Sequence, residues 1–212
     1  MKKAIMLSVV FVFAAGCNSV YCNTMEKFGN PKRDILVERV EGARDSQQIA
    51  KAQFSSALEK FKYIVDVNSG LLEEKYELFK DELKKSESQA NGLYKQIDAV
   101  EDVANALFEE WENELGQYSS ADLRSASRAQ LDQTKQRYAQ MIGSMQKAQG
   151  KMESVLAVFR DQVLFLKHNL NARAITSVRG KFGSMEKEMN QLVAEMNKSI
   201  AEADSFIKTM KE

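Results

Sequence analysis

Cys17 is the residue whose neighbours point most clearly to a particular reaction. It follows Ala14, Ala15 and Gly16, and a cysteine directly after such small residues is similar to a bacterial lipobox. In a lipobox the cysteine thiol is acylated, and the cysteine becomes the first residue of the mature chain. Ala14 stands three residues before the cysteine, where leucine is the commoner residue. The spacing therefore predicts lipid attachment at Cys17, and ordinary secretion with a free thiol is the alternative.

The residues before Cys17 have the composition of a secretory signal. Lys2 and Lys3 precede an apolar run over residues 4–13, which is too short to span a bilayer as a helix. We expect residues 1–16 to be a lipoprotein signal peptide and residues 17–30 to be a lipidated tether. The remaining residues, 31–212, form the predicted helical domain.

Other side chains that could carry out chemistry do not form a recognisable set. His168 is the only histidine, and the sequence contains no Glu-x-x-His pair of the di-iron bundles. Seven acidic residues between 98 and 114 could chelate a divalent cation, but they spread around a helix and read better as a solvated face. The ten methionines fall largely on helix ladders, where methionine fills cores. The sequence therefore predicts no catalytic residue, no cofactor and no metal site, and a protein that is not an enzyme.

Composition narrows the class of protein further. The chain has 30 basic and 30 acidic residues, so removal of Lys2 and Lys3 leaves 28 against 30, a net charge of −2. A nucleic-acid binder would need a basic excess, so no nucleic-acid partner is expected. Cys22 is the second of two cysteines, either an incidental thiol or one that links neighbouring lipoproteins. Pro31 is the single proline, which permits long unbroken helices after it.

The apolar residues of the rest of the chain recur at alternating steps of three and four, the heptad pattern of coiled coils. Four such ladders run over 36–64, 72–111, 131–166 and 175–210. Further apolar residues flank each ladder, and this width suits a helix that packs on two neighbours. The fold class is therefore predicted as all-α, an elongated antiparallel four-helix bundle with coiled-coil-like heptad packing. The few polar residues on the ladders are Gln47, Ser86, Thr134, Gln162 and Ser199.

Breaks in the ladders predict the connections between the helices. Residues 68–70 read Asn-Ser-Gly and mark a turn, and Gly116 ends the second helix. Ser119 and Ser120, with Asp122, resemble a capping box that starts the third. Residues 169–171 interrupt the third junction less clearly, and a bend in a continuous helix is an alternative at both Asn-containing junctions.

Two further patterns concern how the helices approach each other. The acidic stretch ends at Gly116, and Arg124, Arg128 and Lys135 follow it, so a hairpin between the second and third helices would bring opposite charges together. Gly143 and Gly150 lie on one side of the third helix, and we expect them to permit close approach of a neighbouring helix; a hinge is the alternative.

The stretch Leu166-Lys-His-Asn-Leu-Asn-Ala-Arg-Ala-Ile175, together with the lipobox and the long helices, resembles an uncharacterised family of Gram-negative bacterial lipoproteins, a domain of unknown function. The resemblance covers most of residues 30–212. It implies no enzymatic activity and no catalytic residues. Asn18 after the cysteine is similar to a signal for sorting to the outer membrane. The expected location is thus the periplasmic face of the outer membrane.

These observations favour an outer-membrane-anchored periplasmic lipoprotein that acts as a non-enzymatic interaction or envelope-support bundle. The alternative is a periplasmic bundle that binds a small ligand or lipid in its methionine-rich interior; a buried cavity would favour that alternative. The expected partners are the membrane, through the lipid on Cys17, and a protein whose identity the sequence does not give. The sequence does not specify the oligomeric state either. His168, Asn169 and Asn171, at the turn furthest from the tether, are the candidate partner contacts.

Overall fold

The structure is a computed structural model that describes residues 31–66, 72–169 and 172–212. Four long helices account for nearly all of these residues: α2 (Lys32–Asp66), α3 (Leu72–Leu115), α4 (Ala121–His168) and α5 (Ala172–Lys211). No strand occurs in the described ranges. The predicted all-α fold is confirmed. The turn predicted at residues 68–70 lies outside the described residues, as does Asn171.

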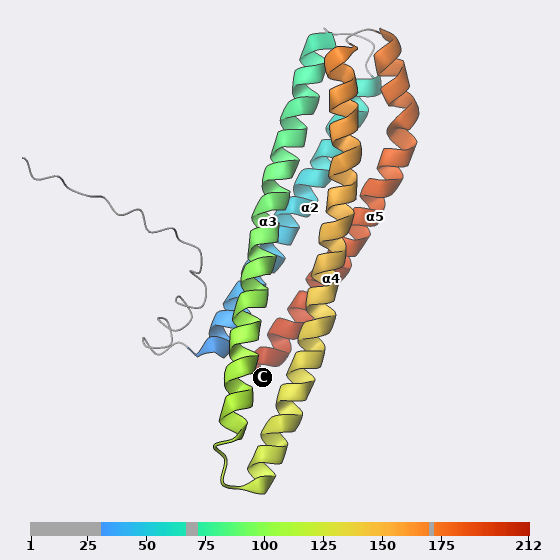
Figure 1. The fold of residues 1–212 in the computed structure, drawn as a ribbon. Helices are drawn as coiled ribbons and strands as arrows, with labels where there is room; N and C mark the ends of the chain where they lie inside the picture. The colour runs from blue at the N-terminus through green and yellow to red at the C-terminus, as the bar shows by residue number, and fades with distance from the viewer. Residues whose placement is uncertain (1–30, 67–71, 170–171) are drawn as a thin grey trace, which may run out of the picture.

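The helices form an elongated antiparallel bundle (Figure 1). Contacts join α2 to α3, α3 to α4, α4 to α5 and α5 back to α2, so each helix packs on two neighbours as its wide apolar stripe predicts. At one end, which we call the distal end, α2 and α4 finish and α3 and α5 begin. At the other, the basal end, lie the start of α2, the turn between α3 and α4, and the end of α5 (Figure 1).

The predicted heptad ladders face the core. None of the ladder residues is exposed, and most are buried. Near the distal end each helix contributes one phenylalanine to a layer of rings whose centroids lie 4.5 to 6.1 Å apart. The four rings belong to Phe61, Phe79, Phe159 and Phe182. Burial of such large apolar side chains is the main stabilising term of the fold.

Local capping signals fix where α4 begins. The Ser120 hydroxyl accepts a hydrogen bond from the backbone N–H of Leu123 at 3.3 Å, as the capping prediction requires. α2 begins at Lys32, directly after the single proline. The Pro31 carbonyl already accepts from the N–H of Ile35 at 3.2 Å, so proline occupies the cap position.

Two arginines join α2 to α5 at opposite ends of the bundle. The Arg33 guanidinium, in the first turn of α2, donates from Nε to the Met210 carbonyl at 2.9 Å, and a second N–H of the same group also donates to it. Arg179, near the start of α5, donates in the same manner to the Val65 carbonyl, with its Nε at 2.7 Å. Each carbonyl belongs to the last turn of its helix, where backbone acceptors lack intrahelical partners and a cation is favoured.

The prediction that Gly143 and Gly150 permit close helix approach is wrong. A Cβ atom built at either glycine meets no atom within 4 Å, and both residues are exposed. The ladder of α4 follows Met141, Met145 and Met152, which places the two glycines on the outer side of the helix.

Candidate functional site

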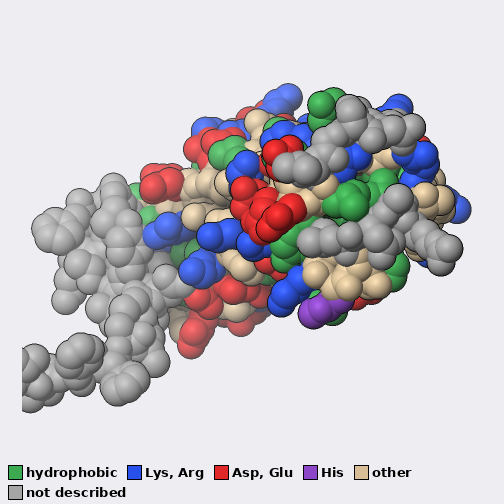
Figure 2. Space-filling view, turned by 90° about the horizontal axis from the view of Figure 1, so that it is seen from above, with side chains coloured by type: hydrophobic (Ala, Val, Ile, Leu, Met, Phe, Trp, Pro, Cys, Tyr) green, Lys and Arg blue, Asp and Glu red, His purple; other side chains and the backbone are tan. Residues whose placement is uncertain are grey.

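The exposed large hydrophobic side chains are concentrated at the two ends of the bundle. Leu164 and Phe165, in the last turns of α4, are 57% and 41% exposed. Tyr63 of α2 and Leu78 of α3 lie near the same distal end and are 64% and 48% exposed. Two more, Tyr118 and Leu123, lie at the α3–α4 turn, and Ile49 alone lies mid-bundle. Figure 2 views the distal end from above and shows hydrophobic side chains at its surface.

Two of the residues predicted as partner contacts, His168 and Asn169, lie at the distal end and have different roles. His168 is the last residue of α4 and is exposed. Asn169 caps the helix: its backbone N–H donates to the Leu166 carbonyl at 3.1 Å, and its side-chain Nδ2 donates to the Phe165 carbonyl at 2.9 Å. Asn169 therefore has a structural function, whereas the His168 side chain is accessible. Asn171 and the predicted lipidation residue Cys17 lie outside the described residues.

Sequence reasoning did not single out Leu164 and Phe165. Both lie between Val163, which is beside the ladder, and the ladder residue Leu166, so their apolar neighbours mask them in the sequence. The sequence does contain one indication of their exposure, because neither residue occupies a ladder position. The inward-facing side of α4 is already formed by Phe159, Val163 and Leu166, which are all buried. An apolar residue between such positions must face outward on a 3.6-residue helix.

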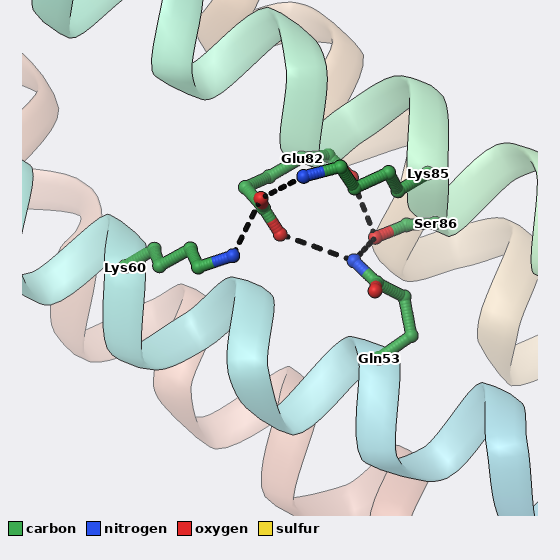
Figure 3. A network of polar contacts seen from close by, with 5 residues as sticks. All are labelled: Gln53, Lys60, Glu82, Lys85 and Ser86. Carbon is green, nitrogen blue, oxygen red and sulfur yellow. Dashed lines mark hydrogen bonds and ion pairs between the residues drawn. The ribbon is translucent and has the colours of Figure 1, made fainter.

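A buried carboxylate joins α2 and α3 below the distal end (Figure 3). The Glu82 side chain is only 4% exposed and accepts from Lys60 Nζ at 2.7 Å, Lys85 Nζ at 2.9 Å and Gln53 Nε2 at 3.1 Å. The Ser86 hydroxyl donates to the Glu82 backbone carbonyl at 2.8 Å. Burial by itself raises the pKa of Glu82, but the three donors outweigh it and hold the pKa below its ordinary value. The cluster holds α2 and α3 in one register.

Loss of the Glu82 charge should weaken the fold. Since the pKa of Glu82 is lower in the folded state, its contribution is complete above the unfolded pKa of about 4.3 and is lost as pH falls through the folded value. We expect Glu82→Gln to reduce the free energy of unfolding at pH 7 by about 1 to 3 kcal/mol. In urea unfolding, the free energy of unfolding of the variant should also decline less between pH 7 and pH 3 than that of the unaltered protein.

Glu77→Gln, which removes an exposed pair with Lys80, is the matched control and should change stability by under about 1 kcal/mol. Equal losses in the two variants would contradict the role of the buried carboxylate.

A second buried polar pair connects α2 and α5. Gln47 Nε2 donates to the Ser199 hydroxyl oxygen at 2.8 Å, and both residues are fully buried. Gln47 Oε1 has no hydrogen-bond partner in the structure. Both residues are among the polar ladder positions noted in the sequence. Such a pair fixes the alignment of two helices at some cost in stability.

The acidic stretch of α3 is used for ion pairs with neighbouring helices. Glu110 Oε2 lies 2.9 Å from Lys32 Nζ, and Glu112 pairs with Lys135, as the charge pattern predicts. The hydrogen bond from Lys135, with the charges of Lys135 and Arg128, lowers the pKa of Glu112. Within the part of the chain that the structure describes, no three His, Cys, Asp or Glu side chains are grouped so that they could hold a metal ion. None of the described helices is long and apolar enough to cross a membrane.

Comparison with known families identifies the family of this chain. The chain belongs to the family described as Protein of unknown function (DUF2959), whose pattern matches residues 21–210. This match includes the whole bundle to within two residues of its C-terminus. No curated protein and no solved structure matches the chain.

Proposed function

We propose that the protein is a non-enzymatic periplasmic lipoprotein, anchored through Cys17 to the outer membrane, whose distal end binds a protein partner. The observation that carries the partner-binding proposal is the group of exposed apolar side chains at the distal end, Tyr63, Leu78, Leu164 and Phe165. Leu164 and Phe165 are adjacent in α4, and neighbouring large apolar side chains left exposed favour an interaction surface. The anchor is supported by the lipobox-like residues, and residues 17–30 directly precede α2, whose start lies at the basal end.

The mechanism would be tethering. Acyl chains on Cys17 would hold the basal end at the membrane, while α4, 48 residues long, extends for about 72 Å away from it. The partner surface would then be presented well above the lipid. We prefer this function to binding of a small ligand, because Met145, Met152 and Met196 are fully buried on the heptad ladders, where methionine is commonly core filler.

The anchor is tested by Cys17→Ser in the full chain. We expect the unaltered protein to partition with membranes and to incorporate labelled fatty acid. The variant should incorporate no label and should accumulate as unprocessed precursor or in the soluble fraction. Because residue 17 precedes the heptad ladders in the sequence, the variant should keep its helical circular dichroism. Unaltered protein recovered mainly from the soluble periplasm would overturn the anchor.

The partner surface is tested separately by photo-crosslinking in intact cells. A photoreactive residue at position 164 should give a discrete protein adduct, whereas the same residue at position 49, which is equally exposed on the flank of the bundle, should not. Phe165→Ser should reduce the adduct at position 164 without a change in melting temperature. Identical adduct patterns at the two positions would contradict a distal binding surface.

A further inference from the structure

The hairpin of α3 and α4 extends beyond the other two helices at the basal end (Figure 1). The start of α2 lies beside Glu110, where Lys32 forms its ion pair, and the C-terminus of α5 lies near it. No residue of α4 between 121 and 130 is buried, and Leu131 is the first that is. At 1.5 Å per residue, the tip of the hairpin therefore projects roughly 15 Å past the rest of the bundle.

This tip has its own internal contacts, which hold it as a defined structure. Trp111 Nε1 donates to the Ser127 hydroxyl oxygen at 2.9 Å across the two helices, and Leu115 is buried beneath the turn at 2% exposure. A terminal nitrogen of Arg124 donates to the Tyr118 carbonyl at 2.6 Å, which closes the turn. The side chains that the tip presents are consequently fixed relative to the bundle axis.

The surface of the tip combines an aromatic residue, an aliphatic residue and few charges. Leu123 is 60% exposed and Tyr118 is 37% exposed, the two large hydrophobic side chains exposed at this end. The charged groups nearest the turn are Glu114, Asp122 and Arg124, a net charge of −1. Tyrosine and leucine next to polar groups suit the headgroup region of a bilayer, where an aromatic ring with a polar tip is favoured.

We propose that this hairpin tip rests on the lipid surface and sets the orientation of the bundle, with Tyr118 and Leu123 at headgroup depth. The proposal depends on the lipid anchor proposed above. Residues 18–30 connect Cys17 to the basal end and can span at most about 43 Å, so the tip and the anchoring membrane lie on the same side of the bundle. The carboxylates of Glu114 and Asp122 oppose deeper insertion, because transfer of a charge into hydrocarbon is costly. The acyl chains would supply the affinity, and the tip would supply the angle at which the distal end is presented.

Lipid-quenching measurements on the lipidated full-length protein test the proposal. In a Cys22→Ser background, single cysteines at positions 123, 164 and 49 are labelled with a nitrobenzoxadiazole fluorophore. Each protein is reconstituted into vesicles of phosphatidylethanolamine and phosphatidylglycerol, with and without headgroup spin-labelled lipid. We expect several-fold stronger quenching at position 123 than at 164 or 49, which lie at the distal end and on the flank.

Each outcome is decisive. Equal quenching at positions 123 and 164, or strong quenching at position 49 from a bundle lying flat, would overturn the proposal. Failure of all three proteins to float with vesicles would instead refute the lipid anchor, so the two failures are distinguishable. A double variant, Tyr118→Ser with Leu123→Ser, should float normally and keep its melting temperature, because both side chains are exposed. A label at position 119 should be quenched in the protein that keeps Tyr118 and Leu123, and this quenching should be lost in the double variant. Equal quenching at position 119 in the two proteins would also overturn the proposal.

Discussion

Phe159→Ala should reduce the free energy of unfolding by about 3 to 5 kcal/mol, the largest effect of any single substitution considered for this bundle. The Phe159 side chain is 2% exposed and packs edge-on against two rings, with centroids at 6.1 Å from Phe61 and 5.8 Å from Phe79. Truncation removes the transfer free energy of the ring and leaves a cavity that neighbours from four long helices cannot easily close. The melting temperature should fall by roughly 10 °C.

The same helix provides a matched control for this substitution. Phe165 lies six residues further along α4 and is 41% exposed, so Phe165→Ala should cost no more than about 0.5 kcal/mol. Phe159→Leu, which retains most of the volume, should fall between the two and remain folded if the alanine variant does not. Urea unfolding of the three variants measures the differences. Similar losses for Phe159→Ala and Phe165→Ala would show that the phenylalanine layer does not stabilise the bundle as described.

The architecture could be predicted from the sequence because heptad packing leaves a simple periodic signal. Each helix must bury a stripe against two neighbours, so its inward residues recur at steps of three and four. Gln47 and Ser199 show how far this reasoning extends, since both were assigned to the ladder despite being polar and both are fully buried. The boundaries near Leu115 and His168 also agree with the capping signals.

Contacts between side chains of different helices could not be predicted in the same way, because the periodicity of one helix does not show which residues of its neighbour lie opposite. Glu82 lies one position before the ladder residue Leu83, and glutamate is a charged residue that usually faces solvent. It is buried because Lys60, from the neighbouring helix, reaches across to neutralise it. The prediction for the two glycines of α4 was wrong for a related reason. Their seven-residue spacing shows that they share one side of the helix, but the ladder residues determine which side packs against a neighbour.

The candidate functional residues were predicted only as a region. The turn near His168 was singled out for its unusual polar residues, whereas the surface at that end owes its apolar character to Leu164 and Phe165. Partner surfaces are made of residues that the core does not need, and periodicity describes only the residues that the core does need. The role of this end is therefore inferred from exposure, which requires the structure.

Removal of both arginines that join α2 to α5 should give the second large effect, a loss of about 2 to 4 kcal/mol for Arg33→Met combined with Arg179→Met. Methionine keeps an apolar stem and removes only the guanidinium, which donates through two N–H groups to a helix-terminal carbonyl in each case. A hydrogen bond from a charged donor is worth about 1.5 to 3 kcal/mol, reduced here because both groups are partly exposed. The two sites lie at opposite ends of the bundle, so the single losses should add to within about 0.5 kcal/mol.

Amide hydrogen exchange distinguishes these contacts from a general effect of charge. Arg33→Met should accelerate exchange in the last turn of α5, around Met210, and leave the last turn of α2 unchanged, while Arg179→Met should do the reverse. Arg44→Met is the matched control, because Arg44 also joins α2 to α5, but through an exposed ion pair with Asp204. It should cost less than about 1 kcal/mol and leave both helix ends protected. If the two single variants accelerated exchange equally at both ends, the arginines would act through the overall stability of the α2–α5 pair and not as caps of individual helix termini.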